Sequence, residues 1–275
     1  EYRNRTHGDS IMKLSVELGE RGYPIYFRSD GRHELVERTI ADSSSGRIIV
    51  VSDENVAPLY ATDFTQALND TGLNAKLITI PAGETTKTLD TVREVYETAI
   101  AHGVDRETHI LAYGGGVVGD VAGFVASTLL RGLPFAQVPT TVLAQVDSSV
   151  GGKVGVNFSG VKNLIGSFYQ PRWVFIDTNH LATLPTEHRR SGLTEAVKHG
   201  LLGGDLVLNN ITENIARVLD GDEQALLNML PTVVKLKADV VSEDERESGR
   251  RVILNLGHTM GHAFETDTAN GPLSH

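Results

Sequence analysis

Two histidines near the end of the chain have the spacing of metal ligands. His258 and His262 lie four residues apart, so on a helix both imidazoles would project from one face. Imidazoles at this spacing bind zinc or a similar divalent ion, and the chain has no cysteine to supply a thiolate. His275 and Glu195 are further candidate ligands. The spacing leaves open which of the four groups bind, and a hydrogen-bonded pair of core histidines is the alternative.

A glycine-rich segment in the middle of the chain has the pattern of a phosphate-binding turn. Gly114, Gly116 and Gly119 satisfy G-x-G-x-x-G directly after an apolar run that ends at Tyr113. Such glycines let the backbone approach a pyrophosphate, and the helix that follows offers free N–H groups. The usual ribose-binding acid about 20 residues later is missing, so Asp53, after an earlier strand, is the replacement candidate. A glycine turn required only for packing is the alternative.

Two other segments combine turns with charged side chains. Residues 147–153 contain an aspartate, two glycines and Lys153, and Lys162 with Asn163 follows shortly afterwards. The lysines supply compact positive charges suited to a phosphate or carboxylate, whereas a solvated loop is the alternative. Residues 81–87 follow another strand and combine a turn with Glu84 and Lys87. That segment fits a ligand loop and an exposed turn equally well.

The hydrophobic pattern predicts the elements that must position these groups. Short β-branched runs, with helical stretches between them, occur at 47–51, 75–80, 109–113, 135–138 and 173–176. Near-continuous apolar strands of this kind indicate a parallel sheet covered on both faces. Beyond about residue 186 the strand signal disappears, and apolar residues recur at helical spacing over 193–202, 206–219 and 225–241. We therefore expect an α/β domain followed by a helical one.

Composition restricts the possible ligands and compartments. The net charge of -10 over 275 residues disfavours a nucleic-acid partner, which requires a basic face. The absence of cysteine excludes a disulfide framework and fits a reducing compartment. Residues 111–130 have the length of a membrane span but contain five glycines and Asp120, so we expect a strand, a turn and a buried helix there. With no secretory signal visible, we expect a cytoplasmic protein without a membrane partner.

Taken together, these segments resemble the 3-dehydroquinate synthase family, a branch of the sugar-phosphate cyclases. Matching motifs follow one another in unbroken order over nearly the whole chain. They lie at 22–25, 81–87, 114–120, 131–132, 138–141, 147–153, 162–166, 168–171, 191–200, 244–247 and 254–265. The resemblance implies a Rossmann-like NAD-binding α/β domain over 1–180 and an all-helical metal- and substrate-binding domain over 181–275. The helical domain is expected to be incomplete, because the chain stops at His275 before the family's last helices.

The resemblance also implies roles for individual residues. The metal, normally zinc with cobalt also suitable, would be bound by Glu195, His258 and His275. NAD would be surrounded by Asp53, Glu84, Lys87, Gly115, Gly116, Val117, Val118, Gly119, Asp120, Thr140, Thr141, Lys153, Lys162 and Thr183. The catalytic and substrate-binding set would comprise Asp147, Lys153, Lys162, Asn163, Lys198, Lys237, Glu247, Arg251, Asn255 and His262. Arg131 matches a family arginine that reaches a neighbouring subunit's site, which implies a homodimer.

The implied reaction belongs to the shikimate pathway of aromatic amino-acid biosynthesis. A carbon–oxygen lyase of this family converts 3-deoxy-arabino-heptulosonate 7-phosphate to 3-dehydroquinate and phosphate by transient oxidation with NAD, phosphate elimination, reduction and aldol cyclisation. The alternatives are a cyclase acting on sedoheptulose 7-phosphate or glucose 6-phosphate, a metal-dependent polyol dehydrogenase, and a remnant that binds NAD without turnover. Residues 147–153, Lys237 and Asn255 favour the dehydroquinate branch, although the loop at 154–158 departs from the family pattern.

Overall fold

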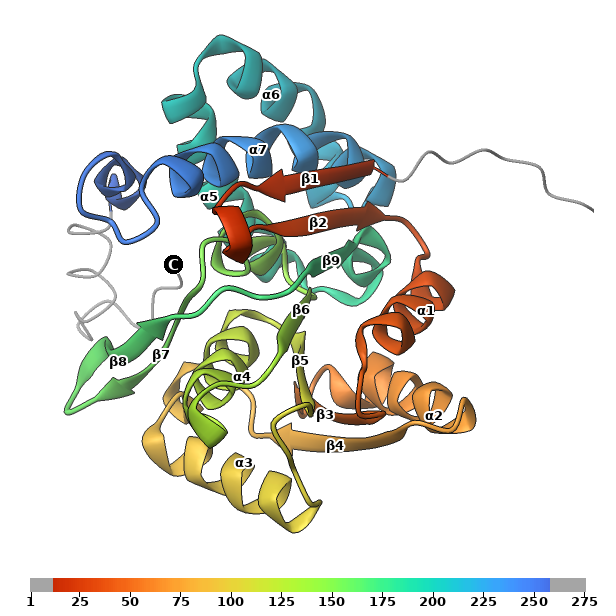
Figure 1. Cartoon of the computed structure of the whole chain (residues 1–275). Coiled ribbons are helices and arrows are strands. Elements are labelled where there is room, and N and C mark those ends of the chain that lie inside the picture. Colours follow the sequence, from red (N-terminus) through yellow and green to blue (C-terminus); the bar gives the residue numbers. More distant parts are fainter. Residues whose placement is uncertain (1–11, 258–275) are drawn as a thin grey trace, which may run out of the picture.

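The computed structural model describes residues 12–257 and contains a seven-stranded sheet with helices on both faces (Figure 1). The strand order is β1-β2-β9-β6-β5-β3-β4, in which β1 runs antiparallel to β2 and all other neighbours are parallel. The strands are β1 (Met12–Val16), β2 (Tyr23–Arg28), β3 (Arg47–Asp53), β4 (Asn74–Ile80), β5 (His109–Gly114), β6 (Phe135–Pro139) and β9 (Val174–Asp177). The five apolar runs in the sequence all form strands of this sheet, as predicted.

Alternating side chains of the central strands fill two separate cores. On β3, Ile48 and Val50 pack with α1 (Arg32–Asp42) and α2 (Thr62–Asp70) on one face. Ile49 and Val51 pack with α3 (Leu89–Ala101) and α4 (Gly116–Thr128) on the other face. Because successive strand residues point to opposite faces, a strand covered on both sides must be apolar throughout. The predicted strand, turn and buried helix over 111–130 is confirmed by β5 and α4.

A two-stranded antiparallel hairpin, separate from the main sheet, was not anticipated from the sequence. It consists of β7 (Lys153–Phe158) and β8 (Val161–Phe168). Val154 and Val156 of β7 pack in the same core as α4, while most of β8 is exposed. The hairpin therefore extends from the α/β region with one strand anchored (Figure 1).

Three helices follow the last strand, as the periodicity predicts. They are α5 (Thr186–Gly203), α6 (Asp205–Leu219) and α7 (Glu223–Glu243). The Asp222 carboxylate accepts the Ala225 N–H at 3.0 Å and so caps the start of α7. Helix α7 lies along β1 and β2 in Figure 1, and its apolar residues share a core with those strands. Strands β1 and β2 are thus packed with the helices in one core. The domain boundary expected at residue 180 stays a prediction.

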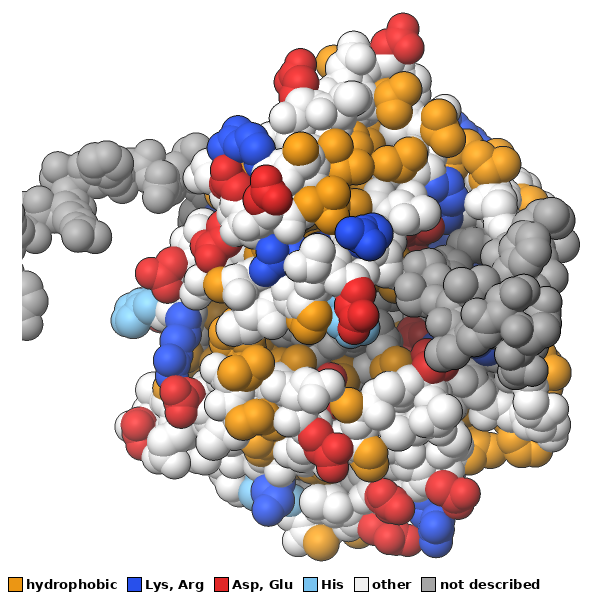
Figure 2. Space-filling model, turned by 180° about the vertical axis from the view of Figure 1, so that it is seen from behind, with side chains coloured by type: hydrophobic (Ala, Val, Ile, Leu, Met, Phe, Trp, Pro, Cys, Tyr) orange, Lys and Arg blue, Asp and Glu red, His pale blue; other side chains and the backbone are white. Residues whose placement is uncertain are grey.

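Short helical turns occupy many of the connections between these elements. They are η1 (Gly19–Arg21), η2 (Ala57–Ala61), η3 (Glu84–Thr86), η4 (Leu129–Arg131), η5 (Ala144–Ser148), η6 (Thr178–Thr183) and η7 (Arg250–Asn255). Within residues 12–257, no helix has both the length and the apolar character needed to cross a membrane. The face in Figure 2 mixes acidic and basic side chains, with hydrophobic ones gathered towards its top, so any anionic ligand bound on that face must be met by local cations.

Candidate functional site

A cavity of about 1350 Å³ lies at the carboxyl ends of the parallel strands. Its walls include residues that follow successive strands, such as Asp53 after β3, Glu84 after β4 and Thr141 after β6. The opposite wall comes from the helices and includes Lys237 of α7. Ligands of open α/β sheets bind at this edge, where loops converge and helices begin. The cavity is therefore the candidate active site.

The glycine-rich turn forms one wall of this cavity. Strand β5 ends at Gly114 and α4 begins at Gly116, with Gly115 as an N-cap that offers no side-chain hydrogen bond. The first N–H groups of α4 are therefore available to an anion. A Cβ at Gly114 would lie 2.6 Å from Val118, so packing also requires a glycine there. Packing therefore explains the glycine at position 114, whereas anion binding explains the open helix start at Gly115 and Gly116.

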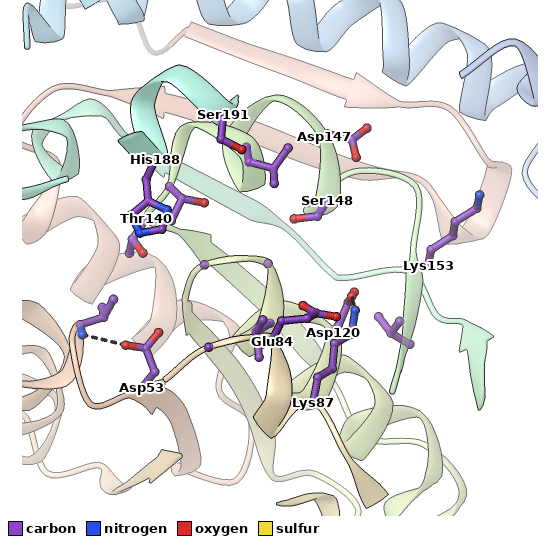
Figure 3. Close-up of a pocket in the computed structure, with 18 of the residues that line it drawn as sticks. Asp53, Glu84, Lys87, Asp120, Thr140, Asp147, Ser148, Lys153, His188 and Ser191 are labelled. Carbon is purple, nitrogen blue, oxygen red and sulfur yellow. Dashed lines mark hydrogen bonds and ion pairs between the residues drawn. The ribbon is translucent and has the colours of Figure 1, made fainter. Parts of the chain in front are cut away.

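Other residues predicted to surround NAD also line the cavity (Figure 3). One oxygen of Asp53 accepts the N–H groups of Asn55 and Val56 at 2.9 and 3.0 Å, which leaves the second oxygen for a ligand. Thr140 Oγ1 is buried without a hydrogen-bond partner among the described residues. A buried polar atom of this kind is expected to bond a ligand or water. The uncapped helix and this hydroxyl fit the phosphates and ribose of a dinucleotide.

Lys87 and Asp120 form an ion pair beneath the glycine turn. The side chains are only 5% and 18% exposed, respectively. Burial raises the pKa of Asp120 to about 6, although the Lys87 ammonium opposes that shift. Lys87 also donates to Asn163 Oδ1 of β8. One lysine thus connects the start of α4 with the hairpin.

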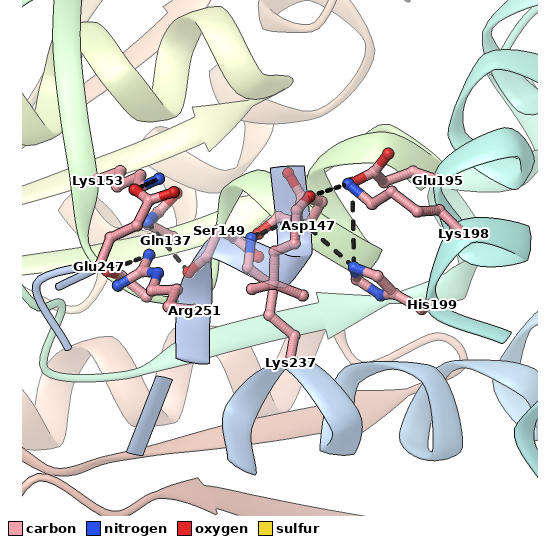
Figure 4. Close-up of polar contacts among 12 residues, drawn as sticks. Gln137, Asp147, Ser149, Lys153, Glu195, Lys198, His199, Lys237, Glu247 and Arg251 are labelled. Atoms are coloured by element: carbon pink, nitrogen blue, oxygen red, sulfur yellow. Dashed lines mark hydrogen bonds and ion pairs between the residues drawn. The ribbon is translucent and has the colours of Figure 1, made fainter. Parts of the chain in front are cut away.

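A second buried ion pair joins Asp147 of η5 to Lys237 of α7 (Figure 4). Burial alone would raise the pKa of Asp147, but the charges of Lys237 and neighbouring cations outweigh it and hold that pKa below its usual value. Lys237 also donates to the Asp147 carbonyl at 2.7 Å. Asp147 consequently faces the cavity as a carboxylate.

Glu195 lies beside this pair on α5, where it forms an ion pair with Lys198. His199 Nε2 is 3.9 Å from Glu195 Oε1 and 3.8 Å from Asp147 Oδ1. Potential ligand atoms of these two acids and His199 all lie within 4.8 Å of one another. Burial lowers the pKa of His199 to about 4, so its imidazole is neutral. Carboxylate oxygens and a neutral imidazole in one buried cluster fit a divalent metal such as zinc.

The hairpin side of the cavity carries Lys153, which pairs with Glu247. Asn255 donates to the same Glu247 carboxylate. Arg251 borders the cavity but is only 1% exposed, because its guanidinium donates to the carbonyls of Gly151 and Glu245. Arg251 therefore also fixes the turn that leads into Lys153.

The structure brings most of the predicted residues together, but not all of them. Val118 and Gly119 are buried under the glycine turn, and Arg131 lies exposed on η4. Glu195, Lys198 and Glu247 stand behind the lining residues rather than on the cavity surface. His258, His262 and His275 fall outside the described residues. The position of Glu195 is thus known, and its two predicted partner ligands stay predictions.

Several lining residues were missed by the sequence reasoning. They include Asn55, Tyr60, His180, His188 and Ser191. His180 lies in η6 directly after β9, so its place at the carboxyl end of a strand was an available signal. His199 stands four residues after Glu195, and that helical spacing was another one.

Comparisons with known proteins match two consecutive segments of the chain to the two domains of one protein family. Residues 77–191 match the family model for the 3-dehydroquinate synthase N-terminal domain, and residues 192–275 match the C-terminal one. A 3-dehydroquinate synthase of Desulforamulus reducens is 45% identical over 262 residues, which cover 95% of this chain and 73% of the relative. One of Pelobacter propionicus is 47% identical over 263 residues, again covering 95% and 73%.

A solved structure of a related protein has the same overall fold as this chain. A 2-deoxy-scyllo-inosose synthase complexed with carbaglucose-6-phosphate, NAD+ and Co2+ has a TM-score of 0.83 and 30% identity over 95% of this chain and 71% of its own. Two matching family models and relatives at this identity decide the classification. With its cavity, glycine turn and buried charged cluster, the chain belongs to the 3-dehydroquinate synthase family.

Proposed function

We propose that this chain converts 3-deoxy-arabino-heptulosonate 7-phosphate to 3-dehydroquinate and inorganic phosphate, as a carbon–oxygen lyase. The observation that carries the proposal is one cavity in which an uncapped helix N-terminus faces a group of lysines. That cavity has room for a dinucleotide and a sugar phosphate together. Relatives of the chain at about 45% identity bear the name of this activity.

NAD would lie along the carboxyl edge of the sheet. The N–H groups at the start of α4 would bind its pyrophosphate, and Asp53 would bind a ribose hydroxyl. Thr140, with its buried hydroxyl, would meet the same ligand. Bound NAD supplies a hydride acceptor that also returns the hydride. The related 2-deoxy-scyllo-inosose synthase, which holds NAD+, supports this assignment.

A zinc or cobalt ion would be held by Glu195 together with His258 and His275. The ion supplies a Lewis acid that polarises hydroxyl and carbonyl oxygens. Asp147 and His199, whose potential ligand atoms lie within 4.8 Å of that of Glu195, would orient this glutamate. His262 would contact the substrate.

The substrate's negative charges would be met on the hairpin side of the cavity. Lys153, Lys162 and Arg251 border the cavity there and would hold the phosphate with Asn163. In the structure Lys153 is paired with Glu247, so an anionic ligand would exchange that partner for its own oxygens. Asp147, kept ionised by Lys237, would accept hydrogen bonds from substrate hydroxyls.

The remaining features of the proposal concern the assembly of the protein. We propose an NAD-binding domain over 1–180 and a metal- and substrate-binding domain over 181–275. Arg131, exposed on η4 at φ 69°, supports a homodimer in which this arginine enters the neighbouring site. The absence of cysteine supports a cytoplasmic location.

A substrate panel tests the proposal. Phosphate release would be measured with the heptulosonate phosphate, sedoheptulose 7-phosphate and glucose 6-phosphate, while absorbance at the NADH band is recorded. We expect release only from the heptulosonate, without net NADH, and loss of activity on chelation that added zinc or cobalt restores. Turnover of sedoheptulose 7-phosphate alone would assign the chain to another cyclase branch, and NADH accumulation with a polyol would make it a dehydrogenase.

A further inference from the structure

Asn157 lies behind the cavity, near the end of β7. It is hydrogen-bonded to residues 84–87 on one side and to β8 on the other. The side chain is half-buried and does not itself line the cavity. Its neighbours Glu84 and Lys87, at η3, do line it, and so does Asn163 of β8. Asn157 is thus placed to act on ligands only through other residues.

The side-chain amide and the backbone N–H of Asn157 have partners in residues 84–87 and in β8. Its amide Nδ2 donates to Glu84 Oε1 at 2.9 Å, and its Oδ1 accepts the Asn163 N–H at 2.9 Å. The backbone N–H of Asn157 donates to the Lys87 carbonyl at 2.8 Å. An asparagine fits this position because the two ends of its amide donate and accept at once.

Lys87 closes the arrangement into a ring. Its ammonium donates to Asn163 Oδ1 and pairs with Asp120 at the start of α4. Asn163 has φ 54°, a left-handed conformation that asparagine tolerates better than most residues. The Asn163 N–H bond to Asn157 holds it there. Glu84, Asn157, Asn163 and Lys87 therefore depend on one another for their orientation.

We propose that Asn157 is a positioning residue that couples binding of NAD to binding of the substrate's phosphate. This inference rests on the proposed function, in which Asn163 serves the phosphate, and on the family resemblance, which places Glu84 and Lys87 beside the dinucleotide. A ligand that fixes Asn163 also fixes Asn157, and through it Glu84, so the second ligand meets an ordered site. Such coupling is reciprocal, because each ligand must change the other's affinity by the same factor.

Calorimetric titration of NAD+ in the absence and presence of saturating inorganic phosphate measures the coupling. For the unmodified chain we expect phosphate to tighten NAD+ binding by about fivefold or more, a typical factor for coupled sites. In Asn157→Asp, which keeps the size and the acceptor but places a second carboxylate beside Glu84, the factor should fall below about twofold. Asn157→Ala, which removes both side-chain bonds, should behave likewise.

Asn209→Asp is the matched control, because it makes the same change at an exposed position of α6. It should retain the full coupling factor. If Asn157 had a purely structural role, its variants would bind NAD+ more weakly both with and without phosphate, or would be less stable in urea. The factor by which phosphate tightens NAD+ binding would then stay unchanged. That outcome, or an unmodified chain in which phosphate has no effect on NAD+ affinity, overturns the inference. Failure to release phosphate from the heptulosonate phosphate, with coupling intact, would instead overturn the proposed function alone.

Discussion

Replacing Lys87 by methionine would leave the Asp120 carboxylate buried without its cation. With Lys87 present, burial already raises the pKa of Asp120 from 3.8 to about 6. The folded state therefore binds more protons than the unfolded state between these values, and stability falls as the pH rises through that window. At about 1.4 kcal/mol per pKa unit, the ionised carboxylate costs the fold about 3 kcal/mol at pH 7.

Without Lys87, Asp120 would escape further cost by keeping a proton above pH 7. Protonation limits the additional loss at pH 7 to about 1.4 kcal/mol, and the lost hydrogen bonds of Lys87 add about 1 kcal/mol. We therefore expect Lys87→Met to lower the free energy of unfolding by about 2 kcal/mol at pH 7 and by about 1 kcal/mol at pH 5, where Asp120 is largely protonated in both proteins.

Urea unfolding followed by circular dichroism between pH 5 and pH 8 would measure these differences. The double variant Lys87→Met/Asp120→Asn removes the carboxylate, so its loss relative to Asp120→Asn should not depend on pH. An equal loss from Lys87→Met at pH 5 and pH 8 would show that the ion pair contributes no pH-dependent stability and that the reasoning is wrong.

Three further substitutions test other parts of the structure. Burial lowers the pKa of His109, so the folded state binds fewer protons than the unfolded state, and stability falls as the pH drops below about 6.5. Between pH 7 and pH 5, the melting temperature of His109→Gln should therefore fall less than that of the unmodified chain. In Gly123→Ala the new Cβ would lie 2.3 Å from Val154 Cγ1, so we expect a loss of about 1–3 kcal/mol in urea unfolding, and an unchanged midpoint would contradict it. Tyr23→Phe removes the acceptor of the Gly151 N–H at 2.9 Å; unfolding should lose about 1–2 kcal/mol and the KM for the sugar phosphate should rise in steady-state assays.

The fold was predictable where the signal is local. The apolar runs at β3, β5 and β9 and the helical spacing of α5–α7 all depend on neighbouring residues, and the structure confirms them. The sheet order was not predictable, since β2 lies beside β9 through pairs such as Ile25 with Val174, about 150 residues apart. The hairpin was also missed, because one of its strands is exposed and lacks an apolar pattern.

The site was predictable to a different extent. The glycine turn could be read from its spacing, and its place between β5 and α4 is confirmed. The cluster of Asp147, Glu195 and His199 was not, because η5 and α5 meet only through the tertiary fold. The sequence near Asn157 and Tyr23 does not indicate what these side chains do, since each acts through a hydrogen bond to a distant segment. Such residues emerge only from the three-dimensional contacts.

The position of β2 in the sheet also constrains how the chain folds as it is synthesised. Its neighbours are β1 and β9, and β9 ends at Asp177. Until that residue has left the ribosome, the first two strands have no partner in the main sheet, and Ile25 and Phe27 lack the helices that cover them. The pair of strands β1 and β2 in the nascent chain thus has an unpaired edge that can associate with other chains. This edge stays exposed while about 150 further residues are translated, at about 5–20 residues per second.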